Sequence, residues 1–140
     1  MFRKILLAVD GSSHALNAAK IAADMARLMT SEQLCVVVVY HPIPTYLGEP
    51  NFQIAIDARL KEAEAIFQQA VKTIGEMPVE IQTELIEGDP AEAIINVAKT
   101  RSSEVIVMGS RGLGRLAGML LGSTSHKVVA HAPCPVLIVP

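Results

Sequence analysis

Residues 105–125 read VIVMGSRGLGRLAGMLLGSTS. A short apolar run, Val105–Met108, is followed at once by a glycine-rich segment that ends in hydroxyl side chains. An apolar run closed by glycine is typical of a buried strand, and serine or threonine favours the start of a helix. The stretch therefore predicts a strand, a glycine-rich loop over Gly109–Gly122 and a helix over Ser123–His131.

The rest of the chain alternates in the same way between strand and helix. Further strands are predicted at Ile5–Val9, Leu34–Tyr40, Val79–Ile86 and Val136–Val139, with helices from Ser12 or Ser13 to Met29, from Phe52 to Ile74 and from Pro90 onward. The unbroken Val36–Val39 run predicts burial on both faces. Alternation over Val79–Ile86 predicts an edge strand. Strands that alternate with helices imply a parallel sheet with right-handed crossovers.

Two helices carry further signals. The third has Asp89 as N-cap, Pro90 at the first helical position and Glu92 at the third, the capping-box arrangement. Its inward positions are Ile94, Ile95 and Ala98. The first helix is predicted to lie close to the sheet on a face of small side chains, made of Leu16, Ala19, Ala23, Ala26 and Met29.

Composition limits the class of protein. The 140 residues suit one domain over 1–140, and 51% of them are hydrophobic without a single Trp, so the core is aliphatic. A net charge of -2 with no basic cluster argues against a nucleic-acid partner. No apolar run reaches the ~18 residues of a membrane span, and no signal peptide is read. Cys35 and Cys134 are expected to be reduced thiols in the cytoplasm.

The ends of the predicted strands mark the place of a site. In open parallel sheets, ligands bind beyond the carboxyl ends of the strands. Asp10, Val39 and Gly109 follow or end three of these strands, so we expect them on one edge. The loop over 41–51, rich in proline, is long for a compact domain and is typical of a lid or binding loop.

The glycine-rich loop predicts an anion site. Glycines let backbone N–H groups approach a phosphate, and the following helix adds free amides and its dipole. The hydroxyls of Ser123, Thr124 and Ser125 add donors. Phosphate is the anion that matches this set best, although a connector without a ligand has the same composition.

Two common phosphate motifs do not fit. A P-loop requires Lys and Ser or Thr after its second glycine, and here Arg115 follows Gly114. A dinucleotide fingerprint over Gly112–Ala117 requires an acidic residue about 20 positions later, and none follows Glu104. Both motifs are therefore rejected.

A third motif fits. Gly109, Gly112 and Gly122-Ser123 form the pattern G-x2-G-x9-G-S/T, and the chain resembles the ATP-binding universal stress proteins that carry it. Other blocks match that family in order: Ile5–Ser12, the Ala-rich first helix, Glu87–Pro90, Val107–Gly112 and Ala132–Val139. The resemblance implies a single-domain α/β fold: an open, Rossmann-like, five-stranded parallel sheet, as in the adenine nucleotide alpha hydrolases, with strand order 3-2-1-4-5 and helices on both faces.

The resemblance also implies the ligand and its contacts. The ligand is ATP, or ADP or AMP. Apart from the resemblance, slow hydrolysis would call for a Mg2+ ion on the phosphates, which the carboxylate of Asp10 would help to hold. Asp10 contacts the ribose, and Val39 meets the adenine through its backbone. Arg111 pairs with a phosphate oxygen. The full predicted set is Ala8, Asp10, Val39, Met108, Gly109, Arg111, Gly112, Gly122, Ser123, Thr124 and Ser125. Two alternatives stay open: Asp10 as a turn residue and Arg111 as a solvated loop residue.

The function that follows is a nucleotide-dependent stress-response or signalling module with a downstream protein partner. Homodimerisation is expected through the edge strand Val136–Val139, unless its own subunit covers that edge. No residue is assigned to catalysis, and none of the four histidines to a metal. The alternatives are a slow ATPase or adenylyl-transfer enzyme, a receiver-like phosphorylation switch and a relative that has lost its nucleotide.

Overall fold

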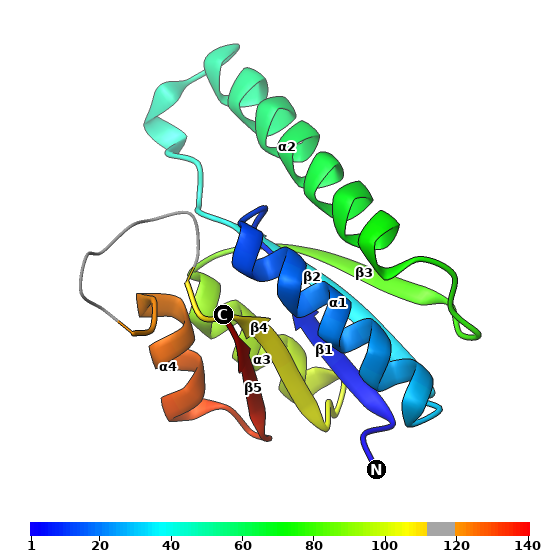
Figure 1. Cartoon of the computed structure of the whole chain (residues 1–140). Helices are drawn as coiled ribbons and strands as arrows, with labels where there is room; N and C mark the ends of the chain where they lie inside the picture. Colours follow the sequence, from blue (N-terminus) through cyan, green and yellow to red (C-terminus); the bar gives the residue numbers. More distant parts are fainter. Residues whose placement is uncertain (112–119) are drawn as a thin grey trace.

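A computed structural model describes residues 1–111 and 120–140 (Figure 1). Within these residues five parallel strands form one sheet in the order β3-β2-β1-β4-β5, which confirms the expected topology. The strands are β1 (Lys4–Ala8), β2 (Gln33–Tyr40), β3 (Ile81–Glu87), β4 (Val105–Gly109) and β5 (Val136–Val139). The helices are α1 (Ser13–Leu28), α2 (Asn51–Ile74), α3 (Pro90–Thr100) and α4 (Ser123–His131), and a 3-10 turn, η1, covers Thr45–Leu47.

Four of the five strands differ from their predicted boundaries by one or two residues. β1 begins and ends one residue earlier than Ile5–Val9, although the N–H of Val9 still donates to the Val37 carbonyl at 3.1 Å. β3 begins at Ile81 rather than Val79. Ile81 pairs with Leu34, so a strand that began at Val79 would run past the start of β2.

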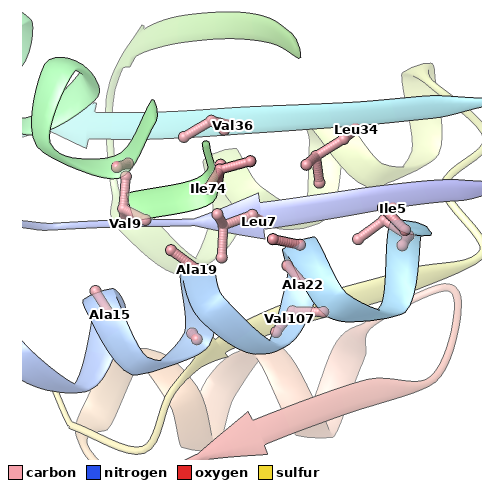
Figure 2. Close-up of a cluster of buried hydrophobic side chains, with 14 of the residues drawn as sticks. Ile5, Leu7, Val9, Ala15, Ala19, Ala22, Leu34, Val36, Ile74 and Val107 are labelled. Carbon is pink, nitrogen blue, oxygen red and sulfur yellow. The ribbon is translucent and has the colours of Figure 1, made fainter. Parts of the chain in front are cut away.

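The sheet is covered on both faces. α1 and α2 pack on one face and α3 and α4 on the other (Figure 1). Alternate residues of β1 serve the two cores: Ile5 and Leu7 face α1, while Leu6 and Ala8 face α3. Figure 2 shows the first of these cores, with side chains from α1 and α2 meeting those of the strands. β2 is buried on both faces over Leu34–Val38, which confirms the prediction for Val36–Val38, whereas Val39 is half-buried.

Alanine makes the inner face of α1. Its buried residues are Ala15, Ala18, Ala19, Ala22, Ala23 and Ala26. Leu16 and Met29, which were expected on this face, are only half-buried. A methyl group fills the space beneath a helix that lies this near the strands, so larger side chains turn to its flanks.

Only the C-terminal half of α2 belongs to the core. Ala63, Ala70 and Ile74 are buried, whereas Leu60 is 45% exposed. The N-terminal half runs past the carboxyl edge of the sheet (Figure 1), where no strand lies beneath it. Although α2 has 24 residues, none of the helices in the described part of the chain combines the length and hydropathy that crossing a bilayer requires.

The start of α3 is as predicted. Asp89 is the N-cap, and its carboxylate accepts the N–H of Glu92 at 3.1 Å. Lys127 on α4 approaches the same oxygen at 3.4 Å. The bond from Glu92 is the main cause that holds the pKa of Asp89 below its ordinary value.

We predict that Asp89→Ala lowers the free energy of unfolding by about 1 kcal/mol at neutral pH, and Asp89→Asn by less, because asparagine also caps helices. Since the folded pKa is depressed, the carboxylate stabilises the fold above its ordinary pKa and loses this effect as pH falls through the folded value. The gap between wild type and Asp89→Ala should therefore narrow below that pKa in urea titrations repeated at falling pH. A gap independent of pH would contradict the assigned role.

Candidate functional site

A cavity of about 440 Å³ opens at the carboxyl edge of the sheet. Its volume lies in the ~300–1,000 Å³ range of small-molecule sites. Every described member of the predicted set lines it: Ala8, Asp10, Val39, Met108, Gly109, Arg111, Gly122, Ser123, Thr124 and Ser125. Gly112 lies outside the described residues. The structure thus brings the predicted residues together, while their part in binding stays a prediction.

Val39 offers its peptide group to this cavity. Successive residues of a strand direct their N–H and C=O groups alternately to the two neighbouring strands. The Val37 carbonyl faces β1, where it accepts the Val9 N–H, and the Tyr40 carbonyl faces β3, where it accepts the Gly88 N–H at 2.9 Å. Val39 therefore faces the side of β1, beyond the residue at which β1 ends. Its donor and acceptor are placed to bind the edge of a planar base.

Asp10 holds the turn between β1 and α1. Its Oδ1 accepts the N–H of Ser12 at 2.9 Å, and the Ser12 hydroxyl oxygen in turn caps α1 by accepting the N–H of Ala15 at 3.2 Å. The turn role that the sequence left open is therefore present. The other oxygen, Oδ2, makes no hydrogen bond to the described residues, so one carboxylate can fix the turn and still present an acceptor to the cavity.

The start of α4 forms the opposite end of the cavity. Gly122 is the N-cap and supplies no side-chain cap. The first helical bond runs from the His126 N–H to the Gly122 carbonyl at 3.0 Å. The amides of Ser123, Thr124 and Ser125 precede it and have no acceptor within the helix. Three N–H groups and the positive end of the helix dipole together suit an anion.

Ser125 has a different role from the one expected of its hydroxyl. The side chain is buried, and its Oγ donates to the Gly109 carbonyl at 2.8 Å. A hydroxyl has one proton to donate, and here that proton joins α4 to β4. The hydroxyls of Ser123 and Thr124 remain as donors for a ligand at this end.

Ser110 fixes the base of the glycine-rich loop. Its N–H donates to the carbonyl of Val139 at 2.8 Å, and its own carbonyl accepts the N–H of Gly122 at 2.7 Å. Its Oγ lies 3.3 Å from Nδ1 of His14 on α1. The two ends of the loop are therefore held together and tied to α1 and β5. The sequence alone gave His14 no partner.

One wall of the cavity was not foreseen from the sequence. α2 contributes Arg59, Glu62, Ala63 and Ile66, which share one helix face. The sequence of this helix does indicate the wall: the inward positions Ala63 and Ile66 are apolar, while Arg59 and Glu62, one turn earlier on the same face, are charged. Other lining residues that were missed include Tyr40, His41, Pro90, Ile94 and Leu121.

The charges of this site come from several elements. Arg59 and Arg111 are its guanidinium groups, and Asp10 and Glu62 its carboxylates. Arg59 Nη1 lies 3.3 Å from Glu62 Oε2. The described residues contain no group of three or more His, Cys, Asp or Glu side chains arranged to hold a metal ion.

The sequence model of the universal stress protein family matches residues 1–140. The chain belongs to the universal stress protein family. A universal stress protein of Thermus aquaticus is 48% identical over 139 residues, which is 99% of either chain.

Solved structures of other universal stress proteins share the fold. UspA from Lactobacillus plantarum superposes with a TM-score of 0.87 at 27% identity, over 99% of this chain and 98% of that one. A universal stress protein in complex with cAMP has a TM-score of 0.73 at 23% identity, over 99% and 97% of the two chains. One from Archaeoglobus fulgidus in complex with dAMP has 0.69 at 24% identity, over 99% and 98%. Similarity at these last two levels establishes the common fold.

In this universal stress protein, we predict that Gly109→Ala destabilises the fold even without a ligand. A Cβ at Gly109 would lie 2.7 Å from the Cβ of His14 and 2.8 Å from its carbonyl carbon, so the backbone of α1 must shift. Overpacking of this kind costs about 1–3 kcal/mol. The midpoint of urea unfolding should fall accordingly with an unchanged slope. An unchanged midpoint would show that α1 does not approach β4 this closely.

Proposed function

We propose that this universal stress protein binds an adenine nucleotide, ATP or its products ADP and AMP, in the cavity at the carboxyl edge. In this proposal the nucleotide state controls the contact with a downstream protein in a cytoplasmic stress response. The observation that carries the proposal is one cavity with two matched ends, the peptide group of Val39 and the first amides of α4, which have no acceptor within the helix.

The spacing of the two ends supports a nucleotide. In the sheet, β1 separates β2 from β4, so the ends of β2 and β4 lie about 10 Å apart at the usual strand spacing. A base on Val39 and phosphates at the start of α4 bridge such a distance. Between them lie the apolar side chains of Ala8 and Met108, with Ile94 of α3 beside them.

The chemistry of each end supports the same ligand. The Watson–Crick edge of adenine has one donor and one acceptor, which match the carbonyl and N–H of Val39. Phosphate matches the α4 amides together with the guanidinium of Arg111. Related universal stress proteins form complexes with cAMP and dAMP, both of which are adenine nucleotides. Mg2+ that arrives with the phosphates would find a carboxylate oxygen in Asp10, and oxygen is the ligand Mg2+ prefers.

We predict that ATP raises the thermal unfolding midpoint of the purified protein. Ligand at 100 times its Kd stabilises the folded state by about 2.7 kcal/mol, which corresponds to a shift of several degrees for a domain of this size. Gly122→Val should abolish the shift, because its side chain would cover the amides at the start of α4. At φ -67 and ψ 163, Gly122 has a backbone conformation open to valine, so the variant should still fold.

The variant's own midpoint without nucleotide serves as the control for folding. No shift of the wild type at millimolar ATP would contradict the proposal. The alternative of a slow ATPase or adenylyl-transfer enzyme uses the same cavity and rests on Asp10 Oδ2, which makes no hydrogen bond to the described residues. Turnover that Asp10→Ala abolishes while ATP binding persists would favour the enzyme.

We further propose that two copies pair through β5. This strand ends the sheet, and Leu137 within it is 37% exposed. A short apolar edge tends to pair with another chain. Light scattering should therefore give about twice the 15.0 kDa of the chain, and Leu137→Lys should shift the mass toward one copy. Leu28→Lys, at the exposed C-terminal end of α1, should leave the mass unchanged; a single-copy mass for the wild type would contradict pairing.

A further inference from the structure

The wall formed by α2 is fixed to the turn that holds Asp10. Ile66 lies against Gly11, where a Cβ would come within 3.4 Å of Ile66 Cγ1. Ala63 is buried beside it in the core. Arg59 lies seven residues before Ile66 on the same helix face, which is about 10 Å farther along the axis. The packing of Ile66 and Ala63 therefore sets Arg59 above the carboxyl edge, on the wall of the cavity.

Arg59 forms a weak, solvent-exposed ion pair with Glu62. Its ion pair with Glu62 joins residues three apart on one helix, and the two side chains are 51% and 68% exposed. Pairs of this kind contribute little to stability because water screens them. A phosphate group carries more charge than a carboxylate and accepts two parallel bonds from a guanidinium. An anionic ligand in the cavity can therefore replace Glu62 as the partner of the Arg59 guanidinium with little loss of stability.

We infer that Arg59 is a specificity residue for the phosphate chain of the bound nucleotide, with Glu62 as its partner in the free protein. This inference rests on the proposed function. When the ligand enters, the guanidinium turns from Glu62 to the phosphates. The carboxylate of Glu62, left without its partner, then repels the same phosphates. Arg59 and Glu62 therefore act with opposite signs on the affinity for phosphorylated ligands and leave a ligand without phosphate unaffected.

We assign Arg59 to the phosphates rather than to the base because of the other groups that line the cavity. The base has a donor and an acceptor at Val39 and apolar neighbours in Met108 and Ile94. The phosphates have the amides of α4 and the exposed guanidinium of Arg111 on one side. A second guanidinium on α2 supplies charge from the opposite wall, where the only other charged side chain contributed by this helix is Glu62.

The test is a comparison of ATP and adenosine by isothermal titration at physiological ionic strength, where exposed charges are screened beyond about 8 Å. Arg59→Gln should weaken ATP binding about tenfold, as expected for the loss of a charge-assisted phosphate contact, and change adenosine binding less than about twofold. Glu62→Gln should tighten ATP binding by about two- to fivefold and leave adenosine unchanged, because one repelling charge is removed.

Two variants of the same helix serve as matched controls. Lys61→Gln and Glu64→Gln make the same changes of charge at exposed positions that do not line this cavity. They should alter ATP affinity by less than about twofold, because their charges are screened.

The outcomes separate the inference from the proposed function. Wild type that binds neither ATP nor adenosine would overturn both. Wild type that binds ATP with an affinity unchanged in Arg59→Gln would overturn the inference alone. An equal loss for ATP and adenosine would also overturn it, because Arg59 would then act on the base or ribose. A loss for Lys61→Gln as large as that for Arg59→Gln would show an effect of net charge and overturn the assignment to Arg59.

Discussion

The close approach of α1 to the end of β4 is the constraint on which the site depends. A helix that presents alanine to the sheet can lie near enough that Gly109 has no room for a Cβ beside His14. This distance fixes Ser110, whose hydroxyl meets His14 and whose carbonyl holds the N–H of Gly122. The start of α4 is thereby placed by the packing of α1, on the other face of the sheet. Glycine at 109 is required by that packing before any phosphate is considered.

Unequal strand lengths make the other end of the cavity. β1 stops at Ala8, opposite Val37, while β2 continues to Tyr40. The peptide group of Val39 is left facing a place where a longer β1 would have covered it. The orientation of the Val39 N–H and C=O groups is already fixed, because β2 pairs with β3 along this part of the strand. This end of the cavity therefore results from the position at which β1 ends.

Much of this could be predicted from local patterns. Apolar runs gave the strands to within two residues, and the capping sequence at Asp89 gave the start of α3, because both depend on interactions between near neighbours in the chain. The order of the strands came from the family resemblance, since periodicity does not specify which strands are neighbours. The turn role of Asp10 was foreseen as an alternative, and the structure shows that it coexists with a place in the cavity.

The residues that were missed depend on long-range geometry. The sequence predicted the range of α2 but not where this helix passes the edge of the sheet, so the place of Arg59 on the cavity wall was overlooked. The hydroxyl of Ser125 was expected to contact a ligand. Its actual acceptor, the Gly109 carbonyl, is sixteen residues away in sequence, so no local pattern could indicate this hydrogen bond. Contacts of this kind follow only once the sheet and helices are assembled.

The cavity combines fixed and adjustable donors. The amides of α4 and the peptide group of Val39 belong to the folded backbone, so their orientation is established before a ligand enters and no reorganisation is needed. The side chains of Arg59 and Glu62 on α2 are different, because they are exposed and, within the described residues, are held only by their ion pair with each other. A substitution of Arg59 or Glu62 changes the charge of the cavity without disturbing the core, whereas a substitution of Gly109 disturbs the packing of α1 against β4. Under the proposed function, the fold therefore separates the backbone groups that would bind the phosphates from the side chains that would discriminate between ligands.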